Sequence, residues 1–394
     1  MREAYIIDAV RTPCGKANKG SFRYTYPDTL GAAVVADLLV RNPLIEKERI
    51  DDVVIGCAFP EASQGLNIAR QIALLAGLPD SVPGMTVNRF CSSGLQTIAM
   101  AAERIMVGAS DVIIAGGVES MSMVPMGGMS VQPNPTIVDS RPEIYISMGL
   151  TAENVANKYG ISRDDQDEFA LSSHQKAVSA WENKRFESQI TSVNVIQQKV
   201  TTSGELFEET VAITVDEGPR ADTSLEVLNK LRPVFKVRGS VTAGNSSQMN
   251  DAAAAVMVVS GEVVKELGLK PIARYVAFQV AGVAPHIMGI GPIEAVPKVL
   301  QNGGLEIKSI DLIELNEAFA AQSLAVIREL EIDPDIININ GGAIAMGHPL
   351  GCTGAKLTTQ ILHDLMAQKK KYGMVTMCIG GGMGAAGIFE NLNL

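Results

Sequence analysis

The sequence predicts a layered α/β fold made of two similar units, with a third segment inserted between them. Glycines gather where runs of apolar residues end, at residues 114–117, 340–342 and 379–382. This pattern is typical of buried strands that turn sharply into the next element. Several stretches near the start of the chain also recur, in the same order, near its end. Between these copies, the composition changes to methionine-rich turns and polar helices.

The internal repeat sets the expected domain organisation. The similar stretches are residues 50–59 and 310–319, 68–70 and 326–328, 91–94 and 352–354, and 112–117 and 375–381. We therefore expect a first unit over residues 1–120 and 245–272, in which Asp251 to Val259 forms a returning buried strand, and a second unit over residues 273–394. Residues 121–244 are expected to form an inserted lid or loop domain, since loops on a rigid scaffold usually carry binding function.

Composition excludes several classes of protein. The 394 residues are 46% hydrophobic and 19% charged, which is typical of a globular chain with a large core. A net charge of −10 leaves no broad basic face for nucleic acid, although it allows a local cationic pocket for a small anion. No apolar stretch approaches the roughly 20 residues of a membrane span. Residues 4–10 indicate a strand rather than a signal peptide, so a cytoplasmic location is expected.

Cysteine usage argues against disulfides and metal binding. The five cysteines are widely spread, with no Cys-x-x-Cys pair and no histidine cluster at metal-ligand spacing. We expect reduced thiols and no metal site.

Cys91 is the first candidate for chemistry. The apolar residues from Leu95 to Met106 have helical spacing, and Gly108 is placed to end that helix. Cys91 would then lie at the amino end of a buried helix, where unpaired N–H groups and the helix dipole are expected to lower the thiol pKa. The alternative is an inert cysteine packed in the core.

His348 is the second candidate, because it stands among glycines and before Pro349 on a constrained loop. The alternative is a structural histidine in a turn. His174 and His363 lie in helical, partly polar stretches and are expected at the surface, whereas His286 follows a proline in a turn.

Two further segments end in groups that could serve chemistry. Cys378 precedes the run Gly380 to Gly382, which lacks the lysine of a phosphate-binding loop but leaves backbone amides bare. Asn316 ends an expected strand before a helix, where helix capping is the alternative role. Together, a cysteine thiolate, a histidine base and amide donors form a set suited to acyl transfer through a thioester.

Seven segments carry a resemblance to a known family. The chain closely resembles the thiolases, in order and over its whole length, at residues 11–16, 88–94, 116–122, 242–247, 316–320, 347–349 and 378–384. The resemblance implies the duplicated thiolase core, with two five-stranded sheets in an α/β/α/β/α arrangement, and a loop domain.

The resemblance also implies residue roles. Cys91 would take the acyl group, and His348 would activate first Cys91 and later the thiol of coenzyme A. Cys378 would move the proton at the carbon where the bond is broken or made. His348 and a water held by Asn316 would form one oxyanion site, and the backbone amides of Cys91 and Gly380 would form the other.

Coenzyme A enters as a substrate, and no cofactor is implied. The positions that match its binding path in the family are Met148, Arg220, Ser247, Met288 and Phe319. The family further implies a homodimer or homotetramer, and some members join hydratase and dehydrogenase partners in a β-oxidation complex.

The direction of the reaction depends on the pocket. Short-chain members commonly have His-Met-Gly where this chain has Ser147-Met148-Gly149, and residues 216–220 and 347–354 also resemble the degradative 3-ketoacyl-CoA thiolases. We therefore expect thiolytic cleavage of 3-ketoacyl-CoA in β-oxidation, with Ser147 leaving room for longer acyl chains.

Three alternatives stay open. Residues 338–342, Asn-Ile-Asn-Gly-Gly, resemble the biosynthetic branch, so an acetyl-CoA C-acetyltransferase is the first. The condensing enzymes of fatty-acid synthesis share the fold but typically pair their cysteine with two histidines. A catalytically silent, lipid-binding thiolase-like protein would be expected to lack a catalytic residue, and none is missing here.

Overall fold

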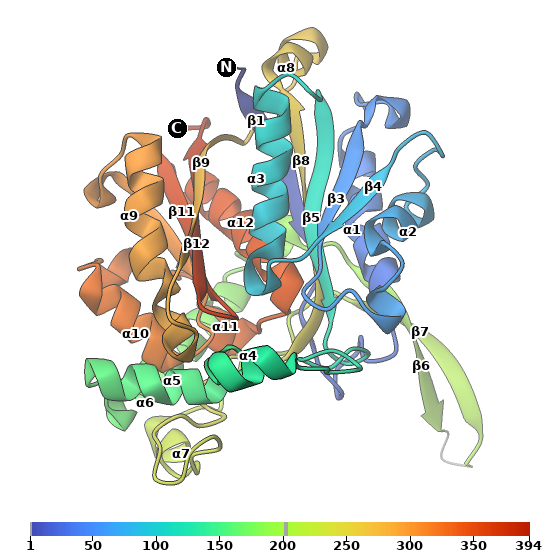
Figure 1. The fold of residues 1–394 in the computed structure, drawn as a ribbon. Helices are drawn as coiled ribbons and strands as arrows, with labels where there is room; N and C mark the ends of the chain where they lie inside the picture. The colour runs from blue at the N-terminus through green and yellow to red at the C-terminus, as the bar shows by residue number, and fades with distance from the viewer. Residues whose placement is uncertain (1, 201–203) are drawn as a thin grey trace.

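One large sheet organises the molecule. The computed structural model describes residues 2–200 and 204–394. The strand order is β10-β11-β12-β9-β1-β8-β5-β3-β4, with β2 paired to β8 (Figure 1). The strands are β1 (Ala4–Arg11), β2 (Gly15–Lys16), β3 (Asp52–Gly56), β4 (Gly84–Val87), β5 (Val112–Ser120), β8 (Asn250–Ser260), β9 (Ala273–Gly282), β10 (Leu312–Leu315), β11 (Tyr372–Ile379) and β12 (Met383–Asn391).

The two halves of this sheet repeat one pattern, as the sequence predicts. In the first half, β3 runs parallel to β4 and β5, and β8 runs antiparallel to β5 and β1. In the second half, β10 runs parallel to β11, and β12 runs antiparallel to β11 and β9. The strand β8, which follows the inserted segment, returns to the first half.

The structure differs in two details from the expected pair of five-stranded sheets. The fifth position of the second half holds only an isolated bridge between Ile313 and Ile337. The two halves are also joined, because β1 pairs with β9 at Tyr5 with Arg274 and at Ile6 with Ala273. The sequence repeat does not predict this short pairing of β1 with β9, because pairing between edge strands depends on how the two units dock.

Helices complete the expected α/β/α/β/α layers (Figure 1). Helices α3 and α12 lie between the half-sheets, α1 and α2 cover the first half, and α9 covers the second, with α10 beside it. The helices are α1 (Pro27–Arg41), α2 (Ile68–Leu75), α3 (Ser93–Met106), α4 (Pro135–Ser140), α5 (Met148–Tyr159), α6 (Arg163–Glu182), α7 (Leu225–Asn229), α8 (Gly261–Leu267), α9 (Gly291–Gly303), α10 (Ala320–Glu329), α11 (Ala343–Met346) and α12 (Leu350–Gln368).

The largest apolar cluster fills the central layer. Side chains of α3, such as Leu95 and Ile98, pack there with Leu357 and Ile361 of α12 and with both half-sheets. This shared core fixes the start of α3 relative to the start of α12. The first residues of these helices are the part of the fold that positions the site.

The inserted segment carries α4 to α7 and a hairpin of β6 (Val193–Val200) and β7 (Leu206–Ile213), which extends away from the body (Figure 1). Among the helices in the described ranges, none combines the length and the apolar character needed to cross a membrane.

Candidate active site

Cys91 lies at a corner between β4 and α3. A single 3-10 turn, Phe90–Ser92, joins the two elements, and Phe90 has a φ of 42°. The Ser93 hydroxyl holds this turn, because it accepts the N–H of Arg89 at 2.8 Å and donates to the carbonyl of Phe90 at 2.7 Å. The predicted helix is confirmed: α3 ends at Met106, and Gly108 follows with a φ of 76°.

The prediction of a lowered pKa at Cys91 is wrong for the resting pocket. Burial raises the pKa of this thiol to about 11, although hydrogen bonds from the backbone N–H groups of Gly380 and Cys91 act in the opposite direction. Loss of hydration penalises the charged form more than two amide donors favour it. The resting group is therefore a thiol, so a nucleophilic role for this sulfur requires a base that takes its proton.

His348 is placed to accept that proton. Its Nδ1 lies 2.6 Å from Thr353 Oγ1, and its Nε2 lies 3.4 Å from Asn316 Nδ2. Since an amide nitrogen only donates, Nε2 accepts, and Nδ1 carries the hydrogen that it donates to Thr353. Burial, followed by the charge of Lys356, lowers the pKa of His348 to about 3. The imidazole is neutral, with a lone pair on Nε2.

Thr353 and Asn316 fix the ring from opposite sides. Thr353 was missed by the sequence analysis, although its position five residues after His348, in the first turn of α12, could have indicated it. Asn316 follows β10, and its backbone N–H donates to the carbonyl of Thr376 at 2.9 Å. Its Oδ1 is buried and has no hydrogen-bond partner among the described residues, so the amide keeps a free acceptor beside the imidazole.

Cys378 lies within β11 and is fully buried. Burial raises the pKa of this thiol well above its usual range, and the nearby Cys91 raises it further. The following glycines form the turn into β12, and a Cβ at Gly380 would lie 3.7 Å from the Phe90 ring and 3.8 Å from the Met148 sulfur. Gly380 thus faces the turn that carries Cys91.

The three reactive groups share one cavity. Cys91, His348 and Cys378 all line a space of about 650 Å³. Its other lining residues are mainly apolar: Ala17, Met121, Met126, Met148, Gly149, Val234, Phe235, Ala243, Met249, Met288, Ala318, Phe319 and Leu350, together with Lys16, Asn18, Lys19, Ser246, Ser247 and Gln248. The structure therefore brings together the residues that the sequence analysis selected for catalysis.

Four of the five residues predicted to bind substrate, Met148, Ser247, Met288 and Phe319, line this cavity. Arg220 lies in a neighbouring cavity of about 270 Å³ that shares Lys16, Ala243 and Gln248 with the first, and it pairs with Asp222 at 3.2 Å.

Two other expectations about side chains are not met. The surface position expected for His174 is wrong, because its side chain is buried and accepts the N–H of Arg220 at 3.2 Å. Ser147 is exposed and lies outside the residues that line the catalytic cavity, whereas its neighbour Met148 lines it.

Comparison with known proteins identifies the family. The thiolase N-terminal domain matches residues 4–262, and the thiolase C-terminal domain matches residues 269–391. The chain belongs to the thiolase family.

Several relatives of this thiolase chain match over nearly their full length. A 3-ketoacyl-CoA thiolase of Bacillus subtilis is 54% identical over 99% of this chain and 100% of the relative. An acetyl-CoA acetyltransferase of Pseudomonas aeruginosa is 44% identical over 98% of each chain. The crystal structure of the Bacillus anthracis acetyl-CoA acetyltransferase superposes with a TM-score of 0.88 at 40% identity, covering 100% of this chain and 99% of that one.

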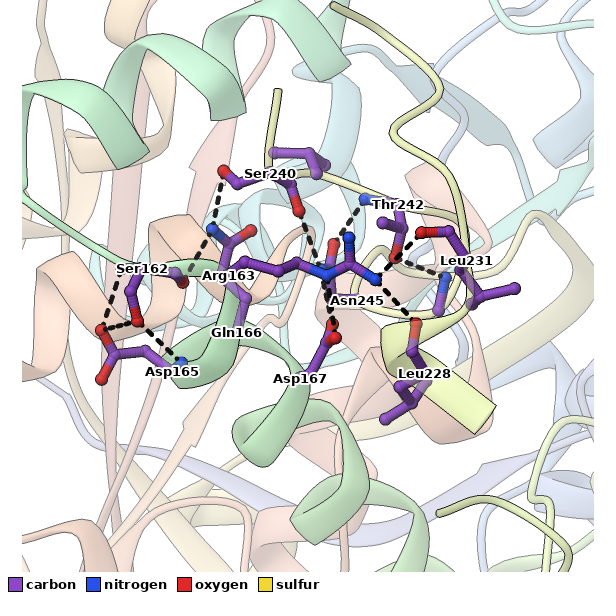
Figure 2. Close-up of polar contacts among 12 residues, drawn as sticks. Ser162, Arg163, Asp165, Gln166, Asp167, Leu228, Leu231, Ser240, Thr242 and Asn245 are labelled. Carbon is purple, nitrogen blue, oxygen red and sulfur yellow. Dashed lines mark hydrogen bonds and ion pairs between the residues drawn. The ribbon is translucent and has the colours of Figure 1, made fainter. Parts of the chain in front are cut away.

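In this thiolase chain, residues at the start of α6 contact Asn245 (Figure 2), which directly precedes Ser246 and Ser247 of the cavity wall. Asp167 accepts hydrogen bonds from Asn245 Nδ2 at 2.9 Å and from Arg163 Nε at 2.8 Å. The Asn245 amide oxygen in turn accepts the backbone N–H of Thr242 at 2.8 Å. These contacts are made by residues that do not line the cavity, and they hold the segment that supplies part of its wall.

Glu119 ties the two halves of the site together, a role that the sequence analysis missed. Its buried carboxylate accepts the backbone N–H of Ala58 at 2.8 Å and that of Gly351 at 2.7 Å, and Gln64 donates to it at 2.8 Å. Gly351 lies in the first turn of α12, three residues after His348. In the described part of the chain, no group of three or more His, Cys, Asp or Glu side chains is arranged to hold a metal ion.

Proposed function

We propose that this chain catalyses thiolytic cleavage of 3-ketoacyl-CoA, giving acetyl-CoA and an acyl-CoA two carbons shorter, with Cys91 carrying the acyl group as a thioester. The observation that carries the proposal is the shared cavity, in which one histidine and two cysteines meet on a largely apolar wall.

In the first half-reaction, Cys91 Sγ attacks the 3-keto carbon while its proton passes to His348 Nε2. The backbone N–H groups of Cys91 and Gly380 stabilise the resulting oxyanion, at about 3 kcal/mol for each donor. The bond between C2 and C3 then breaks, and its electron pair forms the enolate of acetyl-CoA. The Cys378 thiol donates its proton to C2, and acetyl-CoA leaves.

In the second half-reaction, a new coenzyme A resolves the thioester. His348 first passes the proton that it took from Cys91 to the Cys378 thiolate. Its Nε2 is then free to accept the proton of the coenzyme A thiol. The coenzyme A sulfur attacks the Cys91 thioester, and Cys91 leaves as a thiolate that takes the proton from His348. Both cysteines are thereby thiols again, and the imidazole is neutral.

Coenzyme A acts as a substrate in this scheme, and the scheme uses no cofactor. Lys16 and Lys19, which line the cavity, and Arg220, in the cavity beside it, supply the cationic groups for its phosphates in an otherwise acidic chain. The flexible side chains of Met121, Met148 and Met288 can repack around acyl tails of different lengths.

A ladder of 3-ketoacyl-CoA substrates, each assayed for thiolysis, tests the proposal. Each buried methylene contributes up to about 0.8 kcal/mol, so kcat/KM is expected to rise from the four-carbon substrate to medium lengths and then level off. A preference for acetoacetyl-CoA over every longer substrate would instead support an acetyl-CoA C-acetyltransferase, which the Asn-Ile-Asn-Gly-Gly sequence at residues 338–342 favours. No turnover of any substrate would support a lipid-binding protein.

The setting of the enzyme is also part of the proposal. We propose a cytoplasmic homodimer or homotetramer, with residues 121–244 as the substrate-covering domain between units 1–120 with 245–272 and 273–394. Membership of the thiolase family supports the assembly, and light scattering of the purified chain tests it. Co-purification with a hydratase and a dehydrogenase would test the β-oxidation complex.

A further inference from the structure

Lys356 is an unusual residue in the centre of this fold. It lies on α12 with only 1% of its surface exposed. Its Nζ donates one hydrogen bond, to the carbonyl of Gly347 at 3.2 Å, and no ion pair within the described ranges includes it. A buried ammonium without a carboxylate is costly, and an apolar side chain of similar length would normally be more stable there.

The groups around Lys356 leave its charge uncompensated. They are Asp216, Glu314, His348, Cys14 and Cys352. Asp216 is already paired, because its two oxygens accept Arg11 at 2.8 and 2.9 Å. Burial raises the pKa of Glu314 well above its usual value, which favours the uncharged carboxyl, and it also raises the pKa values of both cysteine thiols. Burial therefore favours a state in which the Lys356 charge has no ionised partner of its own.

Gly347 connects this charge to the catalytic histidine. Its φ is 100°, and a Cβ at this position would come within 2.0 Å of Asn250 Oδ1, so only glycine fits. Its carbonyl accepts the Lys356 ammonium and belongs to the peptide bond that leads into His348. The N–H of that peptide donates to the carbonyl of Gln248 at 2.9 Å, so the peptide is held at both of its polar groups.

We propose that Lys356 is a positioning residue for His348, which anchors the carbonyl group before the histidine and places a positive charge beside the imidazole. The anchored peptide fixes the ring between Thr353 and Asn316. Burial is the main reason that imidazolium is disfavoured in the resting enzyme, and the charge of Lys356 adds to it, so His348 Nε2 stays free to take the proton of Cys91. This role rests on the proposed function, since it matters only where His348 acts as a base.

Three substitutions separate the two effects. Lys356→Met removes both the charge and the donor, Lys356→Gln keeps a donor without the charge, and Lys356→Arg keeps both. Exposed Lys369, which follows the end of α12, gives a matched control as Lys369→Met. Each variant is assayed for thiolysis, and the ring signals of the four histidines are followed by NMR against pH, with His348→Asn used to assign the His348 signal.

We expect Lys356→Met to lower kcat about tenfold with KM within about twofold, and to move the onset of His348 protonation upward by about one pH unit. Lys356→Gln should show the same shift in protonation with a smaller loss of kcat, and Lys356→Arg should resemble wild type. If Lys356→Met does not fold, the glutamine variant decides. A variant that loses activity while His348 protonates as in wild type would overturn the proposal, because Lys356 would then be only structural. Wild-type protein without thiolysis would instead overturn the proposed function.

The acidic neighbour gives a second check. Glu314→Gln resembles the protonated carboxyl, so it should leave the protonation of His348 and the rate near neutral pH within about twofold of wild type. Easier protonation of His348 in wild type than in this variant would show that Glu314 is ionised and neutralises Lys356, which would contradict the uncompensated charge.

Discussion

Cys91 and Cys378 line the same cavity, but the two halves of the molecule hold them differently. Cys91 lies at a corner before α3, is 9% exposed, and receives the N–H of Gly380 from the other half. Cys378 lies inside β11 at 0% exposure, within an apolar cluster that includes Met288 and Phe319. The amide donors favour negative charge at one sulfur, and the apolar cluster disfavours it at the other.

The different surroundings of Cys91 and Cys378 show how one residue type can suit two chemical roles. Donors aimed at Cys91 stabilise charge that develops next to it, which suits a nucleophile and its oxyanion. An apolar surrounding keeps Cys378 protonated until a carbanion forms nearby, which suits a proton donor. In the proposed mechanism, the environment of each cysteine, more than the residue type, decides which one carries the acyl group.

The largest expected effect is that of Cys91→Ser. Thiolysis should fall by about four orders of magnitude or more, because a hydroxyl is a weaker acid than a thiol and neutral His348 is a weak base. Intact mass measurement after incubation with acyl-CoA should show no adduct, whereas Cys14→Ala, outside the cavity, should still acylate. An adduct on the serine variant would show that the Cys91 thiol is not required to carry the acyl group.

Cys378→Ala should separate the half-reactions. Acylation of Cys91 from a simple acyl-CoA needs no proton at C2 and should survive, while thiolysis of 3-ketoacyl-CoA should fall by about 10²-fold or more. Stopped-flow acylation and steady-state thiolysis measure the two steps. Equal losses in both would mean that Cys378 is only a packed thiol.

The pH dependence of alkylation further distinguishes Cys91 from Cys378. Since the pKa of Cys91 is raised to about 11, its thiolate fraction should grow about tenfold for each pH unit between roughly pH 7 and 10. The rate of iodoacetamide labelling at Cys91, followed by peptide mapping, should rise accordingly, and Cys378 should stay unlabelled. A labelling rate that no longer rises above neutral pH would mean that Cys91 is already a thiolate in the resting enzyme.

The smallest expected effect concerns His348, which lines the same cavity as the two cysteines. Thr353→Val keeps the shape of the side chain but removes the acceptor of His348 Nδ1–H. One hydrogen bond contributes about 0.5–1.5 kcal/mol, so kcat should fall about two- to tenfold with KM nearly unchanged. Thr358→Val, on the same helix, serves as the control. An unchanged kcat would show that Asn316 alone orients the ring.

Much of the site could be predicted from the sequence, because short motifs fix local corners. The spacing of apolar residues after Cys91 predicts a helix, the glycines beside His348 and Cys378 mark turns, and the repeat indicates that these corners belong to equivalent elements. Local pattern and repeat together place the reacting residues at one junction.

The rest depends on tertiary packing. The raised pKa of Cys91 follows from how the two halves close over it, which a helix-dipole argument ignores. Thr353, Glu119 and Lys356 act through contacts between distant segments, and each would be an ordinary polar residue in its own motif. Arg220 lies outside the catalytic cavity because the loop that carries it turns toward His174.

Hydrogen exchange in the Cys378→Ala variant separates the two proposed roles, in which Cys91 carries the acyl group and Cys378 moves the proton. The variant is incubated with acetyl-CoA in deuterated water, and the same sample is analysed for the Cys91 adduct and for deuterium in the acetyl group. If the roles are divided in this way, the Cys91 peptide should carry an acetyl group, and α-proton exchange should be at least about 10²-fold slower than in wild type. Exchange at the wild-type rate, or the absence of the Cys91 adduct, would contradict this division of roles.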